Sequence, residues 1–271
     1  MGSAVKLDIS GYCARVTLSH SGCLNAMSRA MWRELKQVFE VLQQNLALRC
    51  VVVTGAGSHF CSGGDISEYA SFRFAEDSLR NFHEVEVWGG LQAMLDCDLP
   101  VIALIDGNCM GAGLEIASCC DIRIASTLAR FGAPIGKLGF PMAPREAELV
   151  MRAVGELTAR EMLLAASVFE AAEMLRRGFV GSVVLPAKLL PDGQTLIDKV
   201  CALAPAAARQ NKQSFRVLAP VLRAQSATNL VANAYRYADT AEHREGIQAF
   251  VDKRPPQFLP AFLPHAPDAS V

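Results

Sequence analysis

Two glycine-rich segments carry the residues of this chain whose types and spacing best suit acid–base chemistry. Gly63-Gly64-Asp65 and Gly111-Ala112-Gly113 each precede an expected helix, and Glu115 lies one or two residues into the second of these helices. Backbone N–H groups at helix N-termini favour developing negative charge, and glycine lets a ligand oxygen approach the backbone closely. The two segments therefore indicate a paired oxyanion hole that would stabilise an anionic intermediate.

Structural roles compete with catalysis for the polar residues near these glycines. An aspartate that opens a helix after glycines is typical of an N-cap, so we interpret Asp65 as a capping residue rather than a catalyst. Spacing alone also favours an interaction of Glu115 with the helix dipole over catalysis. Other reactive side chains nearby have no evident activating partner and are interpreted as structural: His59, Ser62, Cys61 and Cys109.

The glycine segments fit two nucleotide-binding motifs poorly. A phosphate-binding P-loop ends in Gly-Lys-Ser/Thr, whereas Gly64 is followed by Asp65. Residues 111–117 form a partial dinucleotide fingerprint, but this lacks the third glycine and the acidic residue expected about twenty positions later. An NAD-dependent enzyme is therefore a less favoured alternative.

The composition is that of a globular protein without a strong overall charge. The 271 residues are 51% hydrophobic, and 26 basic against 27 acidic side chains give a net charge of -1. The length favours one large domain, or a domain with an appendage. Because the protein has no net positive charge to attract nucleic acid or an anionic membrane, we expect neither as a partner.

Cysteine and histidine spacing argues against a metal site and a disulfide framework. The nine cysteines include no Cys-x-x-Cys pair, and the five histidines show no ligand spacing. The longest uninterrupted apolar strand, over residues 101–105, ends before Asp106 and is far shorter than the ~20 residues that span a bilayer. The amino terminus shows no secretory or organelle leader pattern. We therefore expect a soluble, cytoplasmic protein with reduced thiols and no metal.

The elements that must position the glycines begin with a hairpin and a helix. Residues 5–9 and 12–18 alternate apolar and polar side chains on either side of Gly11, which predicts two paired strands. Apolar residues then recur at helical spacing over 31–42, behind Ser28 as a plausible N-cap.

A strand, a glycine-bearing loop and a helix then occur twice. Cys50-Val-Val-Val-Thr54 predicts a buried strand, with a helix starting at Asp65. The second unit has a strand over 101–105 and a helix over 113–120, followed by a strand over 121–125. Two such units predict an α/β fold with mainly parallel strand pairing.

The last part of the chain has an almost entirely helical pattern. Helices are expected over residues 189–202, 206–222, 228–237 and 241–253. We therefore divide the chain into an α/β core domain over 1–203, a helical region over 204–258 and a flexible tail over 259–271.

These motifs together resemble the crotonase, or enoyl-CoA hydratase/isomerase, superfamily over nearly all of residues 5–258. The markers include Leu24-Asn-Ala-Met-Ser28, Phe60-Cys-Ser-Gly-Gly-Asp-Ile66, Gly107-Asn-Cys-Met-Gly-Ala-Gly-Leu-Glu115 and Phe131-Gly-Ala-Pro134. The resemblance implies a crotonase-like spiral of repeated ββα units and a C-terminal helical region for trimer contacts. It also implies a homotrimer or a homohexamer.

The resemblance further implies an acyl-CoA thioester substrate and an enolate intermediate. The N–H groups of Gly64 and Ala112 would bind the thioester oxygen, and Glu115 would act as acid and base. No cofactor is implied beyond the coenzyme A that the substrate carries. The resemblance also implies further substrate-binding residues. The adenine side of the CoA site would be lined by Ser62, Gly63, Asp65 and Ile66. Lys253 would reach the CoA phosphates of its own or a neighbouring subunit.

The sequence departs from the hydratase pattern at Ile135. Family hydratases carry two glutamates, and the second is expected directly after Pro134, where this chain has isoleucine. Isoleucine can neither activate water nor supply a proton, so we predict a single carboxylate acid/base. Isomerisation, decarboxylation, retro-aldol cleavage and an atypical hydration all remain open. A noncatalytic acyl-CoA-binding oligomer is the alternative from a different class.

Overall fold

The computed structural model describes residues 2–218 and 234–257. The predicted helices over 206–222 and 228–237 lie partly outside these residues, and the predicted tail over 259–271 lies wholly outside them. No helix among the described residues is long and apolar enough to cross a membrane.

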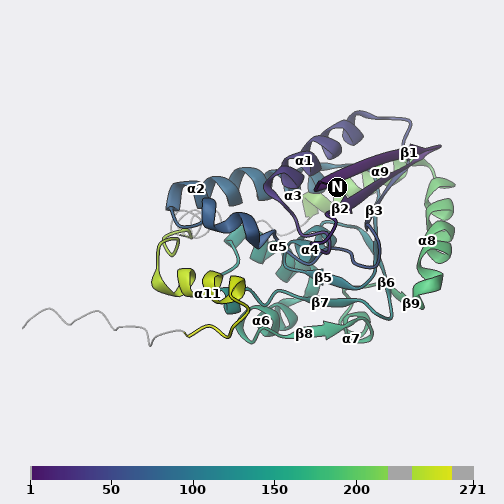
Figure 1. Ribbon diagram of the computed structural model, residues 1–271. Helices are drawn as coiled ribbons and strands as arrows, with labels where there is room; N and C mark the ends of the chain where they lie inside the picture. Colours follow the sequence, from purple (N-terminus) through teal and green to yellow (C-terminus); the bar gives the residue numbers. More distant parts are fainter. Residues whose placement is uncertain (1, 219–233, 258–271) are drawn as a thin grey trace, which may run out of the picture.

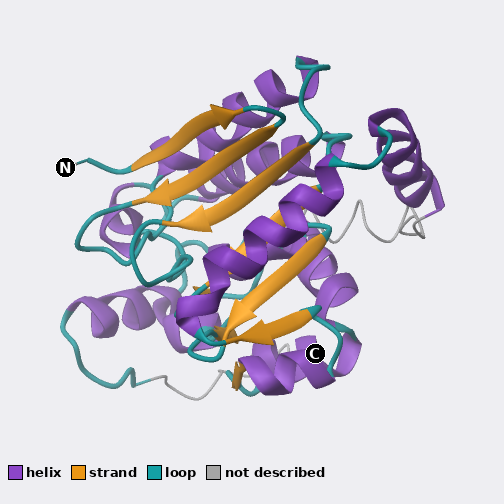
Figure 2. Ribbon diagram, turned by 90° about the vertical axis from the view of Figure 1, so that its right-hand side faces the viewer, coloured by secondary structure: helices purple, strands orange, loops and turns teal. Residues whose placement is uncertain are grey.

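A six-stranded sheet forms the centre of the molecule (Figure 2), with strand order β1-β2-β3-β4-β6-β9. Only β1 and β2 pair antiparallel, and the other neighbours pair parallel. This confirms the hairpin, the two repeated units and the α/β class. The strands are β1 (Ala4–Ser10), β2 (Cys13–Ser19), β3 (Cys50–Gly55), β4 (Val101–Ile105), β6 (Ile122–Ser126) and β9 (Ser182–Val184). A three-stranded sheet contains β5 (Asn108–Met110), β7 (Arg130–Gly132) and β8 (Val168–Glu170).

Helices cover both faces of the larger sheet, because alternate side chains of a strand point to opposite faces. Val51 and Val53 of β3 belong to the main core cluster, together with the apolar face of α1 (Arg29–Gln44). Val52 instead packs with Leu189 and other residues of α8 (Pro186–Cys201), which crosses the other face (Figures 1 and 2). Burial on both faces explains why these strands read as continuous apolar runs.

The first helix begins as predicted, whereas the segment after Asp65 does not form the expected continuous helix. The Ser28 hydroxyl accepts a hydrogen bond from the N–H of Met31 at 3.3 Å and caps α1. Asp65 caps a 3₁₀ helix, η1 (Ile66–Ser71), by accepting from the N–H of Ser67 at 3.1 Å. The chain then continues through α2 (Glu76–Asn81), the π-helical η2 (Phe82–Val87) and α3 (Trp88–Asp96). The remaining short elements are α4 (Ala112–Ser118), η3 (Ile135–Leu138), α5 (Pro144–Val154), α6 (Glu156–Leu164) and α7 (Ala171–Arg176).

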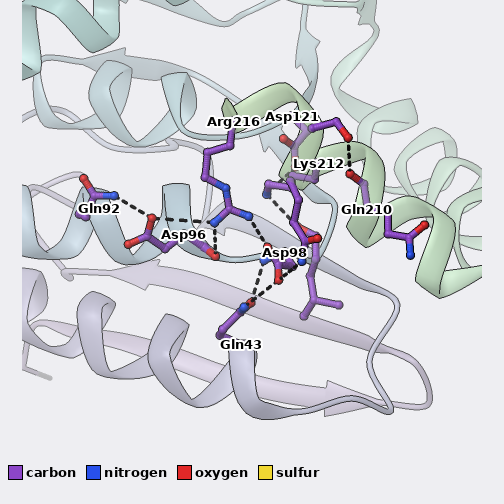
Figure 3. Close-up of polar contacts among 11 residues, drawn as sticks. Gln43, Gln92, Asp96, Asp98, Asp121, Gln210, Lys212 and Arg216 are labelled. Carbon is purple, nitrogen blue, oxygen red and sulfur yellow. Dashed lines mark hydrogen bonds and ion pairs between the residues drawn. The ribbon is translucent and has the colours of Figure 1, made fainter. Parts of the chain in front are cut away.

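Polar side chains attach α9 (Pro205–Leu218) to the core (Figure 3). Asp98, just after α3, pairs with Arg216 and accepts from Gln213 of the same helix at 2.9 Å. Lys212 forms an ion pair of 2.8 Å with Asp121. The apolar side chain of Phe215 on this helix is 71% exposed.

The last described helix, α11 (Ala241–Val251), packs against η1 and η3 rather than against the sheet. Its residues His243, Ile247 and Ala249 are buried (yellow in Figure 1). This helix therefore closes the region in which the two glycine segments meet.

Candidate active site

The two glycine segments lie side by side. The N–H of Cys61 donates to the carbonyl of Asn108, and the N–H of Met110 donates to the carbonyl of Cys61, both at 2.9 Å. Gly64 and Ala112, one from each segment, line the same cavity of about 660 Å³. Among the described residues, no acceptor is present for either of their N–H groups. Two unpaired donors on one cavity are what an oxyanion requires.

Local backbone geometry explains why these positions suit glycine and a helix start. Gly111 has φ +46° and directly precedes α4, so Ala112 is the first helical residue. The N–H groups of a first helical turn have no partner within the helix. At Gly64, a Cβ atom would lie 2.2 Å from the hydroxyl oxygen of Tyr69. Only glycine therefore fits between this hydroxyl and the loop.

Glu115 lies in the first turn of α4 and lines the cavity, with 7% of the residue exposed. Burial raises the pKa of its carboxyl well above the ordinary value, the charge of Glu146 raises it further, and Arg73 lowers it. An interaction with the helix dipole alone would lower the pKa and would not require burial in a cavity. The position of Glu115 therefore suits proton transfer.

Other residues singled out in the sequence divide between the cavity and the surface. The cavity wall includes Ser62, Gly63, Asp65, Ile66 and Ile135. Lys253 is exposed, follows α11 with φ +54° and is not among the residues that line this cavity. Its predicted contact with CoA phosphates stays a prediction.

Structural roles are evident for the four loop residues that were interpreted as structural. The Ser62 hydroxyl donates to the carbonyl of Cys23 at 3.1 Å, and the His59 ring accepts from the N–H of Asn108 at 3.1 Å. Cys61 and Cys109 are fully buried. Burial raises the pKa of the Cys61 thiol to about 12, so it is not a reactive thiolate.

A second buried carboxyl group in the cavity wall was not found by sequence reasoning. Glu146, from α5, is buried, and its Oε1 lies 2.8 Å from Nδ1 of His83 in η2. Burial raises the pKa of Glu146 to about 8, against the lowering effect of Arg73. One signal was present: Glu146 shares the apolar face of its helix with Leu149 and Val150, where a charged residue is unusual.

The rest of the cavity is mostly apolar and shows no metal centre. The wall includes Trp32, Val87, Leu138, Met142 and Phe250, contributed by distant parts of the chain. Within residues 2–218 and 234–257, no three histidine, cysteine or acidic side chains are grouped so that they could hold a metal ion.

Comparison with known proteins places this site in context. A sequence model described as Enoyl-CoA hydratase/isomerase matches residues 8–260. The chain is 30% identical to the (E)-benzylidenesuccinyl-CoA hydratase of Thauera aromatica, over 94% of this chain and 98% of that protein. It is also 30% identical to the short-chain-enoyl-CoA hydratase of Clostridium acetobutylicum, over 92% and 95% of the two chains.

A solved structure shares the fold. The crystal structure of an enoyl-CoA hydratase/carnithine racemase from Magnetospirillum magneticum matches with a TM-score of 0.77 at 32% identity. The match covers 94% of this chain and 95% of the other. The crotonase-like fold class is therefore confirmed.

Proposed function

Because this chain belongs to the enoyl-CoA hydratase/isomerase family, we propose that it acts on an acyl-CoA thioester through an enolate intermediate. The N–H groups of Gly64 and Ala112 donate to the thioester oxygen, which becomes the enolate oxygen. The observation that carries this proposal is that both unpaired N–H groups line one cavity with the buried Glu115.

Glu115 is the group that moves the proton. Its carboxylate accepts the α proton, the electron pair of the broken C–H bond passes to the thioester oxygen, and the carboxylic acid returns the proton to carbon. Glu146 is held by its hydrogen bond to His83, whereas no hydrogen bond ties the Glu115 carboxyl to another described side chain. We therefore propose one mobile acid/base and a second carboxyl that tunes its pKa.

Coenzyme A enters as part of the substrate, and this reaction requires no further cofactor. Residues 62–66 supply one wall for the CoA, and Lys253 offers a cation to its phosphates from the same or a neighbouring subunit. Two relatives are named for hydration of CoA thioesters, a short-chain enoyl and a benzylidenesuccinyl thioester. We propose the same broad substrate class, a cytoplasmic location and a homotrimer or homohexamer for this chain.

The test is turnover of a panel of enoyl-, hydroxyacyl- and malonyl-type CoA thioesters, with products identified by mass. Glu115→Gln should keep the fold and thioester binding and lower turnover by about 100-fold or more, because it removes the proton carrier. Glu156→Gln, at a side chain that is 64% exposed on α6, is the matched control. Unchanged turnover in Glu115→Gln would exclude this mechanism, and binding without any turnover would indicate a noncatalytic acyl-CoA-binding protein.

A further inference from the structure

Arg73 places a buried positive charge in the wall of the cavity. The residue is 1% exposed and follows η1. Among the described residues, no carboxylate oxygen lies within ion-pair distance of its guanidinium, whose hydrogen-bond partners are two histidines and a tyrosine. Burial of a charge is strongly unfavourable unless the charge is paired. No described carboxylate therefore pairs directly with this guanidinium, and Glu115 and Glu146 act on it only at longer range.

The histidine partners of Arg73 are neutral acceptors. Nδ1 of His243 faces the carbonyl of Ala238 at 2.8 Å and must carry the hydrogen, which leaves Nε2 to accept from Arg73 at 3.5 Å. His83 has the same arrangement, with Nδ1 donating to Glu146 and Nε2 accepting from Arg73 at 3.3 Å. Burial lowers the pKa of both rings, that of His243 to about 4. Neither ring compensates the guanidinium charge.

The contacts that hold the guanidinium are also long. The Tyr237 hydroxyl accepts from Arg73 at 3.2 Å, so all three contacts lie at or beyond the long end of the range for hydrogen bonds. A carboxylate would give hydrogen bonds in which both partners are charged, which are shorter, at about 2.7–2.9 Å, and are frequently bidentate. An incoming carboxylate would therefore replace weak contacts with stronger ones.

The guanidinium lies close to the candidate oxyanion hole. Its carbon is 4.4 Å from the ring centre of Tyr69, whose hydroxyl abuts Gly64, and 4.0 Å from the ring centre of Phe140. The charge and the oxyanion donor are thus separated by about one tyrosine ring. Only a few carbon atoms of an acyl chain fit between a thioester at Gly64 and an anion at Arg73.

We propose that Arg73 binds a second carboxylate on the acyl group, so that the preferred substrate is a CoA thioester of a short dicarboxylic acid. This inference rests on the proposed acyl-CoA function and assigns the substrate class of the same site. The planar guanidinium suits bidentate binding of a carboxylate. A neutral acyl chain leaves the buried charge unpaired, and that cost produces the selectivity.

The decisive comparison uses the unchanged protein and matched ligands. The dissociation constants of succinyl-CoA and glutaryl-CoA are measured by calorimetry against those of their terminal amides, which have the same shape and no charge. At least one acid should bind about 10- to 100-fold more tightly than its amide, the range expected for hydrogen bonds to a charged group. Equal affinity of both acids and their amides would overturn the proposal.

Two substitutions assign the effect to its residue. Arg73→Met should reduce the acid-to-amide ratio to about threefold or less, and Arg73→Lys should retain part of the ratio because the charge remains. Lys137→Met is the matched control, because Lys137 is an exposed cation that also lines the cavity. Retention of the ratio in Arg73→Met would overturn the proposal, and its simultaneous loss in Lys137→Met would assign recognition to Lys137.

Failure of this inference differs from failure of the proposed function. If neither acids nor amides nor butyryl-CoA bind, the acyl-CoA function itself is wrong. If thioesters bind and turn over with no advantage for the acids, only the role of Arg73 is wrong. If Arg73→Met does not fold, the acid and amide comparison still tests for recognition of a carboxylate, and Arg73→Lys and Lys137→Met assign it: a ratio lowered in Lys137→Met and unchanged in Arg73→Lys would overturn the role of Arg73.

Discussion

The carboxyl groups of Glu115 and Glu146 share one cavity but have different surroundings. Glu146 has a hydrogen bond to His83, whereas Glu115 follows the N-terminus of α4 and faces the cavity. Burial is the largest cause that raises the pKa of each group, and their mutual repulsion raises that of Glu115 further. At the scale of single residues, burial therefore keeps these two carboxyl groups protonated at pH values at which an exposed glutamate is ionised.

The raised pKa of Glu146 makes stability depend on pH. The folded protein keeps this proton up to about pH 8, whereas the unfolded chain loses it near the ordinary value of 4.5. The free energy of unfolding that this group contributes is therefore complete below pH 4.5 and is lost as pH rises towards 8, by at most about 1.4 kcal/mol per pH unit. Denaturant unfolding from pH 5 to 9 should show this decline, and Glu146→Gln should reduce it, because the raised pKa of Glu115 leaves a decline of its own.

His243 contributes to the pH dependence of stability with the opposite sign to Glu146, so the two effects must be separated by comparing the wild type with a variant. Its pKa is lowered to about 4, so its contribution is lost as pH falls from 6.5 to 4. Subtracting the profile of Glu146→Gln from that of the wild type isolates the carboxyl. Parallel profiles would show that Glu146 is ionised in the folded protein.

Ile135 opens η3 and lines the cavity, and the family resemblance predicts that hydratases carry a second glutamate at this position. Ile135→Glu should raise hydration of a short neutral enoyl-CoA by at least about tenfold, because it supplies a group that can activate water. Loss of the enoyl absorbance measures the rate. Ile135→Gln controls for size, and the burial cost of the new carboxyl limits the gain.

Two results would contradict this interpretation of position 135. The wild type should hydrate such a substrate slowly. A rate equal to that of a two-glutamate relative would show that the isoleucine does not impair hydration. A folded, thioester-binding Ile135→Glu protein with no gain would show that this position does not decide the reaction.

At the scale of elements, α9 is attached by charge rather than by apolar packing. Burial alone would raise the pKa of Asp98, but hydrogen bonds from Gln43, Gln213 and Arg216 lower it overall. The stabilisation from this ionised group is therefore present above pH 3.8 and is lost as pH falls through the lowered value. Figure 3 shows Gln43, Asp98 and Arg216 converging between α9 and the ends of α1 and α3.

Asp98→Asn should loosen α9 without unfolding the core. Hydrogen exchange at pH 7 should be about tenfold faster in α9, because hydrogen bonds to a charged group are lost, and unchanged in β3 and β4. Asp192→Asn, at an exposed position of α8, is the control. Equal protection of α9 in Asp98→Asn and in the wild type would show that other contacts hold this helix.

At the scale of the whole molecule, the C-terminal region closes the cavity and leaves apolar side chains on the surface. Phe250 of α11 lines the cavity, while Phe215 and Val251 are 71% and 57% exposed. Exposed apolar groups on a helical region are typical of subunit contacts. This is consistent with the proposed oligomer.

Deletion of residues 204–271 should give a protein that aggregates or stays monomeric, since it opens the cavity and removes the proposed contacts. Light scattering measures the mass in solution. A chain that ends at residue 257 should assemble like the full protein and serves as the control. A soluble oligomer formed by residues 1–203 would place the interface in the α/β core.

The sequence by itself determined the elements that depend on local chemistry. Period-two alternation predicted the hairpin, the run Cys50-Val-Val-Val-Thr54 predicted a strand buried on both faces, and Ser28 predicted the start of α1. The glycine segments were found for the same reason, because backbone approach and helix starts are properties of adjacent residues. The break in the helix after Asp65 was missed, since packing over the cavity, not propensity, shapes residues 66–87.

Tertiary packing, and not local sequence, brings together the buried polar side chains at the cavity. Arg73 lies in the turn after η1, whereas His83, Glu146 and His243 come from η2, α5 and α11, and nothing in their sequence neighbourhoods relates one to another. Their chemistry comes from burial and mutual distance: the same arginine on a surface would be solvated and the same glutamate ionised. Both properties exist only once α5, η2 and α11 close on the glycine loops.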